Sequence, residues 1–210
     1  MRRVNKSMNW KLSSEQEEPQ QTITMTSHQP QVQSQVMRVI ENHVYFYGDI
    51  VEDNILQLTS TLNELDAKFQ MQNVFIETEP VIHLHINSYG GSLFAGIAAV
   101  DVIRSLKCKV HSHIEGGCAS AATLISVCCD HRTIGKHSKM LIHQLSGAAY
   151  GTYTQMEDAT ENNKTLMATI KSIYKEYTSL PMKNLNEILK HDLWFDSKKC
   201  LEFKLVDQVN

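Results

Sequence analysis

The stretch Ile114-Glu115-Gly116-Gly117-Cys118-Ala119-Ser120-Ala121-Ala122-Thr123-Leu124 decides the fold expected for this chain. Residues 110–114 form a short apolar strand pattern, and the small residues at 119–129 predict a tightly packed helix. A serine at a glycine-rich turn from a strand into a helix is where α/β hydrolytic enzymes place a nucleophile, because the turn exposes the hydroxyl and the helix N-terminus favours developing negative charge. The same small residues also occur wherever a helix packs closely on a sheet, so the candidate needs support from the rest of the chain.

The composition is that of one globular α/β domain. The chain has 210 residues, of which 42% are hydrophobic and 20% charged, and its formal net charge of −3 leaves no footprint of nucleic-acid binding. No apolar run reaches the roughly 18 residues of a membrane span, and the first residues lack the apolar core of a signal peptide. The five cysteines form no Cys-x-x-Cys motif, which indicates buried free thiols and a cytoplasmic location.

Two parts of different composition divide the chain. Residues 1–35 are polar and rich in Gln, so we expect a mobile N-terminal arm or a removable leader. Residues 36–210 are expected to form a single domain, in which strand and helix patterns alternate with crossovers of helix length. This alternation predicts parallel strands with right-handed connections. The expected elements are a strand at 39–47, a helix at 52–69, a strand at 80–86, a helix ending at 106, a strand at 110–114, the helix after Ser120, a loop at 131–137, a strand at 139–143, helices at 154–177 and 181–189, and a short helix with an apolar tail in 192–210.

A serine nucleophile needs a base, and the base needs an acid that orients it. Among the ten histidines, His143 is the one that ends an apolar strand at the sheet edge where the Ser120 turn emerges. Active sites of open parallel sheets collect at this edge. Asp192 follows a predicted helix and precedes two aromatic residues, so its carboxylate can lie half-buried against an imidazole. We therefore predict Ser120 as nucleophile, His143 as base and Asp192 as acid.

The tetrahedral oxyanion of acyl transfer needs two backbone N–H donors. The residue after the nucleophile, Ala121, supplies one of them. The second must come from a neighbouring turn without an obstructing side chain, and Gly90-Gly91 lies at the end of the adjacent predicted strand.

These motifs together resemble the ClpP family, the proteolytic subunits of the ATP-dependent Clp protease. The resemblance covers residues 36–210 and implies an α/β fold of the ClpP/crotonase type, a layered αβ spiral with mostly parallel strands. It also implies a protruding handle, a strand plus a long helix, at about residues 145–177. The motifs that carry it are Asn87-Ser88-Tyr89-Gly90-Gly91-Ser92 with Ala95-Gly96, Gly116 with Ala119-Ser120-Ala121-Ala122, Met140-Leu141-Ile142-His143-Gln144, and Asp192 with Leu205-Val206-Asp207.

The resemblance implies a serine endopeptidase that cleaves unfolded polypeptides inside a barrel of two stacked heptameric rings. An AAA+ unfoldase of the ClpX or ClpA type would feed it and use the ATP, so the chain itself would need no cofactor or metal and would bind neither nucleic acid nor membrane. The site residues that carry over are the catalytic Ser120, His143 and Asp192, the oxyanion donors Gly91 and Ala121, and the substrate-pairing Gly90, Ser146, Gly147 and Ala148. Tyr89 stands where the family usually has proline, and both glycines after it are retained.

Two other functions fit parts of the pattern. A catalytically impaired ring subunit would bind partners without a working triad. A crotonase-type acyl-CoA enzyme would need catalytic carboxylates near the glycine turns, where Glu115 is the only acid. Cys118 lies two residues before the predicted nucleophile and is expected to be a small packing residue.

The pairs His83-x-His85 and His111-x-His113 lie on two predicted strands. Residues i and i+2 of a strand share a face, so neighbouring strands would cluster four imidazoles. Such a cluster is compatible with zinc, although no cysteine or acid completes a site on that face. The alternatives are a lining of the sheet face or of a subunit contact, and a pH-sensitive packing role.

Overall fold

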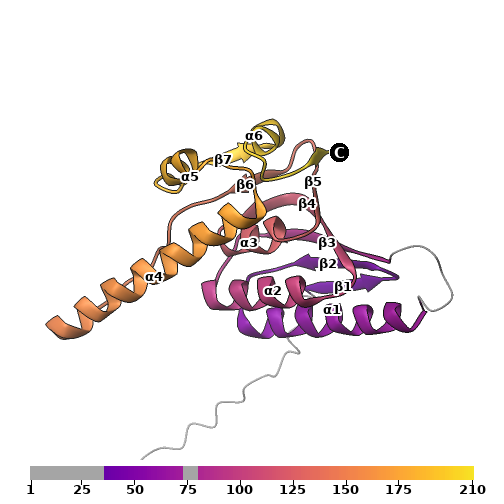
Figure 1. Ribbon diagram of the computed structural model, residues 1–210, viewed down its shortest axis with the longest axis horizontal. Coiled ribbons are helices and arrows are strands. Elements are labelled where there is room, and N and C mark those ends of the chain that lie inside the picture. The colour runs from indigo at the N-terminus through magenta and orange to yellow at the C-terminus, as the bar shows by residue number, and fades with distance from the viewer. Residues whose placement is uncertain (1–35, 73–79) are drawn as a thin grey trace, which may run out of the picture. The chain divides into compact units, whose positions relative to one another are not determined.

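The computed structural model describes residues 36–72 and 80–210 (Figure 1). The expected arm at 1–35 and the connection at 73–79, for which the sequence indicates a loop or short insertion, lie outside these residues. Residues 35–210 form one compact unit. Its elements are β1 (Met37–Ile40), β2 (His43–Tyr47), α1 (Glu52–Gln72), β3 (Val81–Ser88), α2 (Leu93–Ser105), β4 (Lys109–Ala119), α3 (Ala121–Val127), β5 (His131–Ile134), β6 (Lys139–Leu141), α4 (Tyr153–Tyr177), α5 (Met182–Ile188), β7 (Trp194–Asp196), α6 (Ser197–Glu202) and β8 (Gln208–Val209).

A mostly parallel sheet organises the fold, as predicted. Its strands run in the order β1-β2-β3-β4-β5-β8, and every pair in this row is parallel except the antiparallel β1–β2. The long strand β4 changes partner along its length: residues 111–114 pair with β5, and residues 117–119 pair with β6. This switch places the strand that precedes His143 directly beside the end of β4, where Ser120 follows.

Helices α1, α2 and α3 pack together on the sheet (Figure 1). Helix α1 turns Ile55, Leu58, Leu62 and Leu65 inward, and these four side chains are buried. Helix α2 begins after Ser92, whose hydroxyl oxygen accepts a hydrogen bond from the Ala95 N–H and so caps the helix. A Cβ on Gly96 would lie 3.2 Å from the Ala121 Cβ, so α2 approaches the start of α3 closely.

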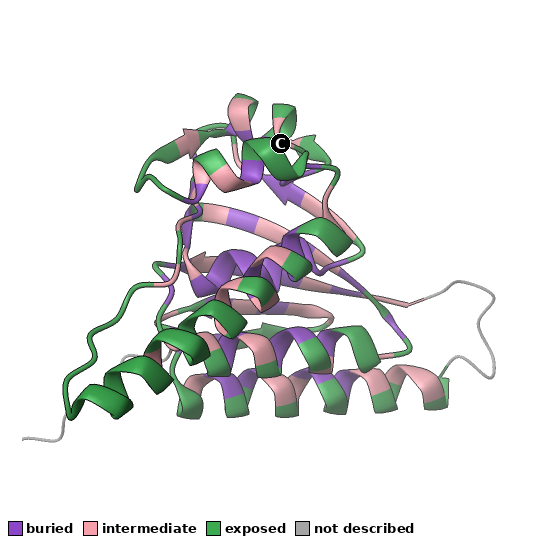
Figure 2. Ribbon diagram, turned by 60° about the vertical axis from the view of Figure 1, so that its left-hand side comes forward, coloured by how far each residue is buried: buried purple, intermediate pink, exposed green. Residues whose placement is uncertain are grey.

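Helix α4 leaves the body of the domain with its N-terminal half exposed (Figures 1 and 2). Its buried residues are Ile170, Ile173 and Tyr174, all in its last third. The long helix of the predicted handle is therefore present. The handle strand is absent from the described part of this single chain: residues 142–152 form no ladder. A strand requires a ladder of backbone hydrogen bonds. Here the Gln144 N–H donates to the Leu189 carbonyl at 2.8 Å and the Leu145 N–H to the Met167 sulfur at 3.1 Å, and these contacts form no ladder.

Three local expectations were wrong. The single strand predicted at 39–47 is a hairpin, because Glu41 takes a left-handed φ of 57° and Asn42 turns away, donating its side-chain amide to the Val81 carbonyl. The loop predicted at 131–137 contains β5, whose polar side chains conceal a strand held between β4 and β8. The strand predicted at 110–114 continues to residue 119 past Gly116, where φ is 80°.

Candidate active site

Ser120 occupies a sharp turn between β4 and α3. Its backbone has φ 53° and ψ −128°, a conformation that a residue with a side chain adopts only when its surroundings impose it. Two contacts impose it here. The Ser120 N–H donates to the Leu141 carbonyl at 2.9 Å, and the Ser120 carbonyl accepts from the Thr123 hydroxyl at 2.6 Å. The turn thereby directs the serine hydroxyl away from the sheet, as in other strand-to-helix nucleophile turns.

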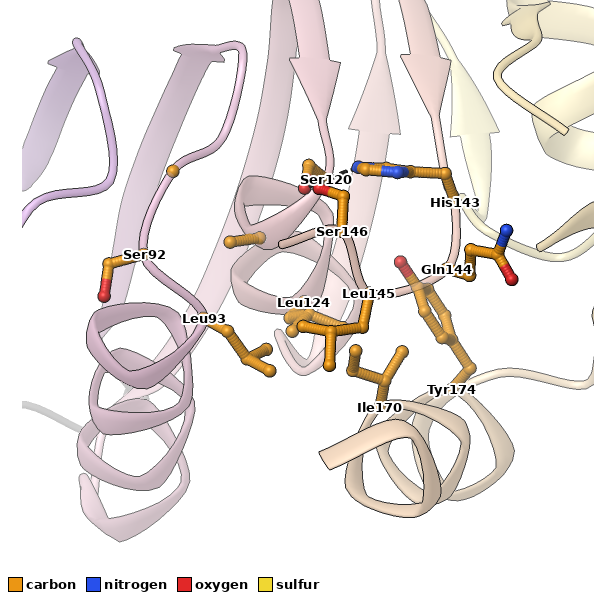
Figure 3. Close-up of a pocket in the computed structure, with 12 residues that line it drawn as sticks. Ser92, Leu93, Ser120, Leu124, His143, Gln144, Leu145, Ser146, Ile170 and Tyr174 are labelled. Carbon is orange, nitrogen blue, oxygen red and sulfur yellow. Dashed lines mark hydrogen bonds between the residues drawn. The ribbon is translucent and has the colours of Figure 1, made fainter. Parts of the chain in front are cut away.

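The structure brings the predicted base to the predicted nucleophile. His143 Nε2 lies 2.8 Å from the Ser120 Oγ, and Figure 3 shows the two side chains pointing toward one another. His143 follows β6 and its side chain is only 18% exposed. When Nε2 accepts the serine proton, Nδ1 must carry the other ring proton, and this nitrogen faces Asp192.

Asp192 lies between α5 and β7 with its Oδ1 3.4 Å from His143 Nδ1. The contact is an ion-pair distance slightly longer than a hydrogen bond. The aspartate side chain is 79% exposed, rather than half-buried as the sequence suggested. Hydrogen bonds between such groups are often long in a free enzyme and shorten in the reacting complex.

Two backbone N–H groups face the same region without an acceptor. The N–H groups of Gly91 and Ala121 find no partner in the part of the chain that the structure describes. Ala121 opens α3, so its N–H has no acceptor within the helix. Gly91 is held against Ile50 by two flanking hydrogen bonds, Ile50 N–H to the Gly90 carbonyl (2.9 Å) and Ser92 N–H to the Ile50 carbonyl (2.7 Å).

Both glycines of this turn are sterically required. A Cβ on Gly90 would lie 2.6 Å from the Ser120 Cβ, and a Cβ on Gly91 would lie 2.3 Å from the Ile50 carbonyl oxygen. Their φ angles of 97° and 147° are also in the left-handed region that favours glycine. The β3–α2 turn can therefore approach the β4–α3 turn only without side chains.

A cavity of about 240 Å³ opens beside the serine and histidine (Figure 3). Its depth is apolar, and the side chains that line it there are Leu93, Leu124, Leu145, Ile170 and Tyr174. Of the predicted substrate-pairing residues, Ser146 lines this cavity, whereas Gly147 and Ala148 are exposed and outside its lining. Gly90 lies behind the serine, with its carbonyl bound to Ile50.

Sequence reasoning missed the residues that support the turn. The Tyr174 hydroxyl, buried in α4, contacts the Thr123 hydroxyl, which in turn binds the Ser120 carbonyl. Burial raises the pKa of Tyr174 well above its ordinary value, so it stays a neutral partner. In the sequence, Tyr174 looks like any other residue on the apolar face of a helix. The neighbouring residues give no sign that it contacts Thr123, which is 51 positions away.

The cysteine side chains lie inside the fold. All five cysteines are free and buried. Cys118 packs between β3 and β6 opposite Ser88 and Met140, and burial raises the pKa of its thiol, so it is the predicted packing residue and no rival nucleophile.

Within residues 36–72 and 80–210, no helix has the length and apolar character of a membrane span.

The histidine pairs do lie on neighbouring strands. His83 is opposite His111, and His85 is opposite His113. His43 of β2 and His131 of β5 extend the row, so six imidazoles share one face of four adjacent strands. We call these six residues the histidine face. No group of His, Cys, Asp or Glu side chains in the described ranges is arranged to hold a metal ion.

The sequence model of the Clp protease family matches residues 31–210. The chain belongs to the Clp protease family. It is 29% identical over 178 residues to the ATP-dependent Clp protease proteolytic subunit 2 of Chlamydia pneumoniae, covering 80% of this chain and 86% of that protein. The same subunit of Chlamydia muridarum (strain MoPn / Nigg) gives the same identity and coverage.

Membership of the Clp protease family fixes the class of activity. The mostly parallel αβ fold and the family match agree, and the chain is a serine endopeptidase of the Clp type. The family match decides for this activity over the crotonase-type acyl-CoA enzyme considered from the sequence.

Proposed function

We propose that Ser120, His143 and Asp192 are the catalytic residues of this Clp-type endopeptidase, and that the chain is not an impaired subunit. The observation that carries the proposal is the 2.8 Å contact between Ser120 Oγ and His143 Nε2 at a strained strand-to-helix turn. The two N–H groups without acceptors, Gly91 and Ala121, supply the electrostatic half of the same chemistry.

In this mechanism the Ser120 oxygen attacks the carbonyl carbon of the scissile peptide bond while His143 Nε2 takes the hydroxyl proton. The carbonyl oxygen becomes an oxyanion that accepts hydrogen bonds from Gly91 and Ala121, and Asp192 stabilises the imidazolium. His143 then donates its proton to the leaving amine as the C–N bond breaks. A water molecule, deprotonated by the same imidazole, hydrolyses the resulting ester and restores the serine.

The apolar cavity accepts the side chain on the acyl side of the scissile bond. Its lining by leucine, isoleucine and tyrosine favours a hydrophobic residue there. The polypeptide pairs in extended form with the backbone along 146–148. The backbone of residues 146–148 supports this role, because its N–H and C=O groups have no hydrogen-bond partner among the described residues and are available to an added strand. Gly90, predicted to pair as well, has both backbone groups engaged, because its N–H donates to the Ser88 hydroxyl at 3.2 Å and its carbonyl accepts from the Ile50 N–H.

The proposal includes the assembly expected for the family. Residues 36–210 form a single peptidase domain whose handle, at about 145–177, meets other copies in a barrel of two stacked heptameric rings. An AAA+ unfoldase of the ClpX or ClpA type supplies unfolded polypeptide and uses the ATP, so this cytoplasmic chain itself takes no cofactor. The N-terminal half of α4, none of whose residues is buried in its own unit, supports a contact with another subunit.

The test is hydrolysis of an unfolded protein such as casein by the assembled wild-type chain and by two variants. Ser120→Ala should abolish cleavage without changing the native mass, and Ser105→Ala, which removes an exposed hydroxyl at the far end of α2, should cleave like wild type. Cleavage by Ser120→Ala at the wild-type rate would contradict the proposal, and so would an inactive wild-type ring.

A further inference from the structure

A second cavity, of about 270 Å³, lies beside the candidate active site and has no role in the mechanism above. The residues that line it are Tyr89, Gly116, Gly117, His137, Lys139 and Trp194. Two of them are close in sequence to residues of the site. Tyr89 precedes Gly90, and Trp194 follows Asp192 by two positions.

The two cavities are lined by opposite ends of the turns that build the site. The first is lined by residues that follow those turns, such as Leu93 and Leu124. The second is lined by residues that precede them, namely Tyr89 before Gly90, Gly117 before Ser120, and Lys139 before His143. A substrate that crosses the serine therefore has one cavity on each side of its scissile bond.

The geometry of an extended chain assigns these cavities to consecutive residues. Successive side chains of a strand point to opposite faces. When the residue on the acyl side directs its side chain into the apolar cavity, the next residue, the first of the leaving half, directs its side chain the other way. We infer that the Tyr89–Trp194 cavity is the binding site for this first leaving-side residue. The inference rests on the proposed function of Ser120.

The lining indicates which side chain fits. The Tyr89 and Trp194 rings are perpendicular, with centroids 6.0 Å apart, and both are accessible, at 71% and 42% exposure. Gly117 leaves the space beside them open, since a Cβ there would contact both rings, at 3.4 Å and 3.7 Å. The rings therefore form an apolar corner that accepts a short hydrocarbon stem.

The charge of the cavity is positive. Lys139 forms no ion pair among the described residues, and no acid lines the cavity. Asp196 is opposite Lys139 on β7, but its carboxylate is used to cap α6, accepting from the Lys199 N–H at 2.9 Å. A glutamate side chain matches this lining best: its methylenes lie in the aromatic corner and its carboxylate reaches the Lys139 ammonium. The site thus selects an acidic residue directly after the cut.

Three peptides that differ only at the first leaving-side position, as Glu, Gln or Ala, test this assignment on the assembled full chain. Wild type should cut the Glu peptide about two- to five-fold faster than the Gln peptide, the range expected for a solvent-exposed ion pair, and the advantage should shrink at high salt. Lys139→Gln should bring the Glu/Gln ratio to about one. Lys136→Gln, which removes a nearby exposed cation outside the cavity, should keep the wild-type ratio.

The aromatic corner has its own variants. Wild type should cleave the Gln peptide faster than the Ala peptide, because the aromatic corner accepts the methylenes. Tyr89→Phe keeps the ring and should keep this difference in rate, whereas Tyr89→Ala should lose it. Equal rates for Glu and Gln in wild type, or a ratio unchanged by Lys139→Gln, would overturn the assignment. A fluorophosphonate probe carries no leaving-side residue and reports the serine separately. If Ser120 is labelled but the Glu and Gln peptides are cleaved at equal rates, only the subsite is refuted. If Ser120 is not labelled, the proposed function is refuted, and so is the subsite that rests on it.

Discussion

Acidification should destabilise this protein through the histidine face, and His113 carries the largest share. Burial, together with the neighbouring imidazoles of His85 and His83, lowers the pKa of His113 to about 4, against a weaker opposing effect of Glu115. Burial and neighbouring imidazoles also lower the pKa of His83, as they do for His111, where Asp130 opposes the shift. A histidine whose folded pKa is depressed stabilises the fold fully above its unfolded pKa of 6.5, and this stabilisation is lost as the pH falls from 6.5 toward 4.

Hydrogen bonds explain why protonation of the histidine face is unfavourable. His83 Nδ1 lies 2.8 Å from His113 Nε2, so one ring must donate and the other accept, and two fully protonated rings cannot keep the bond. The rings of His85 and His113 also stack, with centroids 4.7 Å apart, so two charges would face each other. On the other side, His113 Nδ1 is bound to the Thr133 hydroxyl at 2.8 Å.

The expected loss in the free energy of unfolding follows from these pKa values. With 6.5 in the unfolded chain and about 4 in the folded one, linkage limits the loss between pH 7 and pH 5 to about 2 kcal/mol. Because the ring is only half-buried, solvent screening reduces the expected loss to about 1 kcal/mol. Glu115 adds little in this window. Burial raises its pKa, but hydrogen bonds from Tyr47 and His85 outweigh burial and hold the pKa below the usual value, so its contribution is lost only at lower pH.

The assay is urea unfolding of the full chain at pH 7 and pH 5, at one protein concentration, because assembly adds to apparent stability. His113→Gln keeps groups that can bond to Thr133 but cannot titrate. Its free energy of unfolding should therefore fall between the two pH values by about 1 kcal/mol less than that of wild type. His191→Gln, which replaces an exposed histidine outside the face, should behave as wild type. An equal pH-dependent loss in His113→Gln and wild type would refute the assignment to this residue.

Other predictions concern the site. Asp192→Asn should lower kcat by about 10²- to 10⁴-fold with little change in KM, because the imidazolium loses its partner; an unchanged kcat in steady-state peptide hydrolysis would exclude the aspartate from catalysis. Gly90→Ala places a Cβ 2.6 Å from that of Ser120 at a φ of 97°, and should both abolish hydrolysis and lower the unfolding free energy by about 1–3 kcal/mol. Tyr174→Phe should lower the unfolding free energy by about 1 kcal/mol through the lost contact with Thr123, and an unfolding midpoint equal to that of wild type would show that the contact is dispensable.

The sequence predicts the parts of this fold that local pattern controls. The apolar runs that end in glycine turns identify β3 and β4 with the helices after them, and they place Ser120, His143 and both candidate oxyanion donors at one edge. The local sequence pattern does not predict a strand that forms only because neighbouring strands pair with it. The polar segment of β5 is a strand only because β4 and β8 flank it, and residues 145–152, at the start of the predicted handle, form no ladder.

The histidine face shows the same limit. The two His-x-His pairs predict a shared face within each strand, and the neighbouring registers of β3 and β4 join them. His43 and His131 belong to the row only through strand pairing, which their isolated positions in the sequence do not reveal. Likewise, the exposure of Asp192 depends on the loop after α5 and has no local signature.

The most direct test of the catalytic assignment is to identify the residue that a fluorophosphonate probe modifies. The probe reacts with a serine only when a base and an oxyanion site activate it. After labelling the assembled protein and digesting it, mass spectrometry should find the adduct on Ser120 alone, and His143→Ala should lose the adduct. An adduct on another serine, or no adduct on a ring that nevertheless cleaves unfolded protein, would contradict the account.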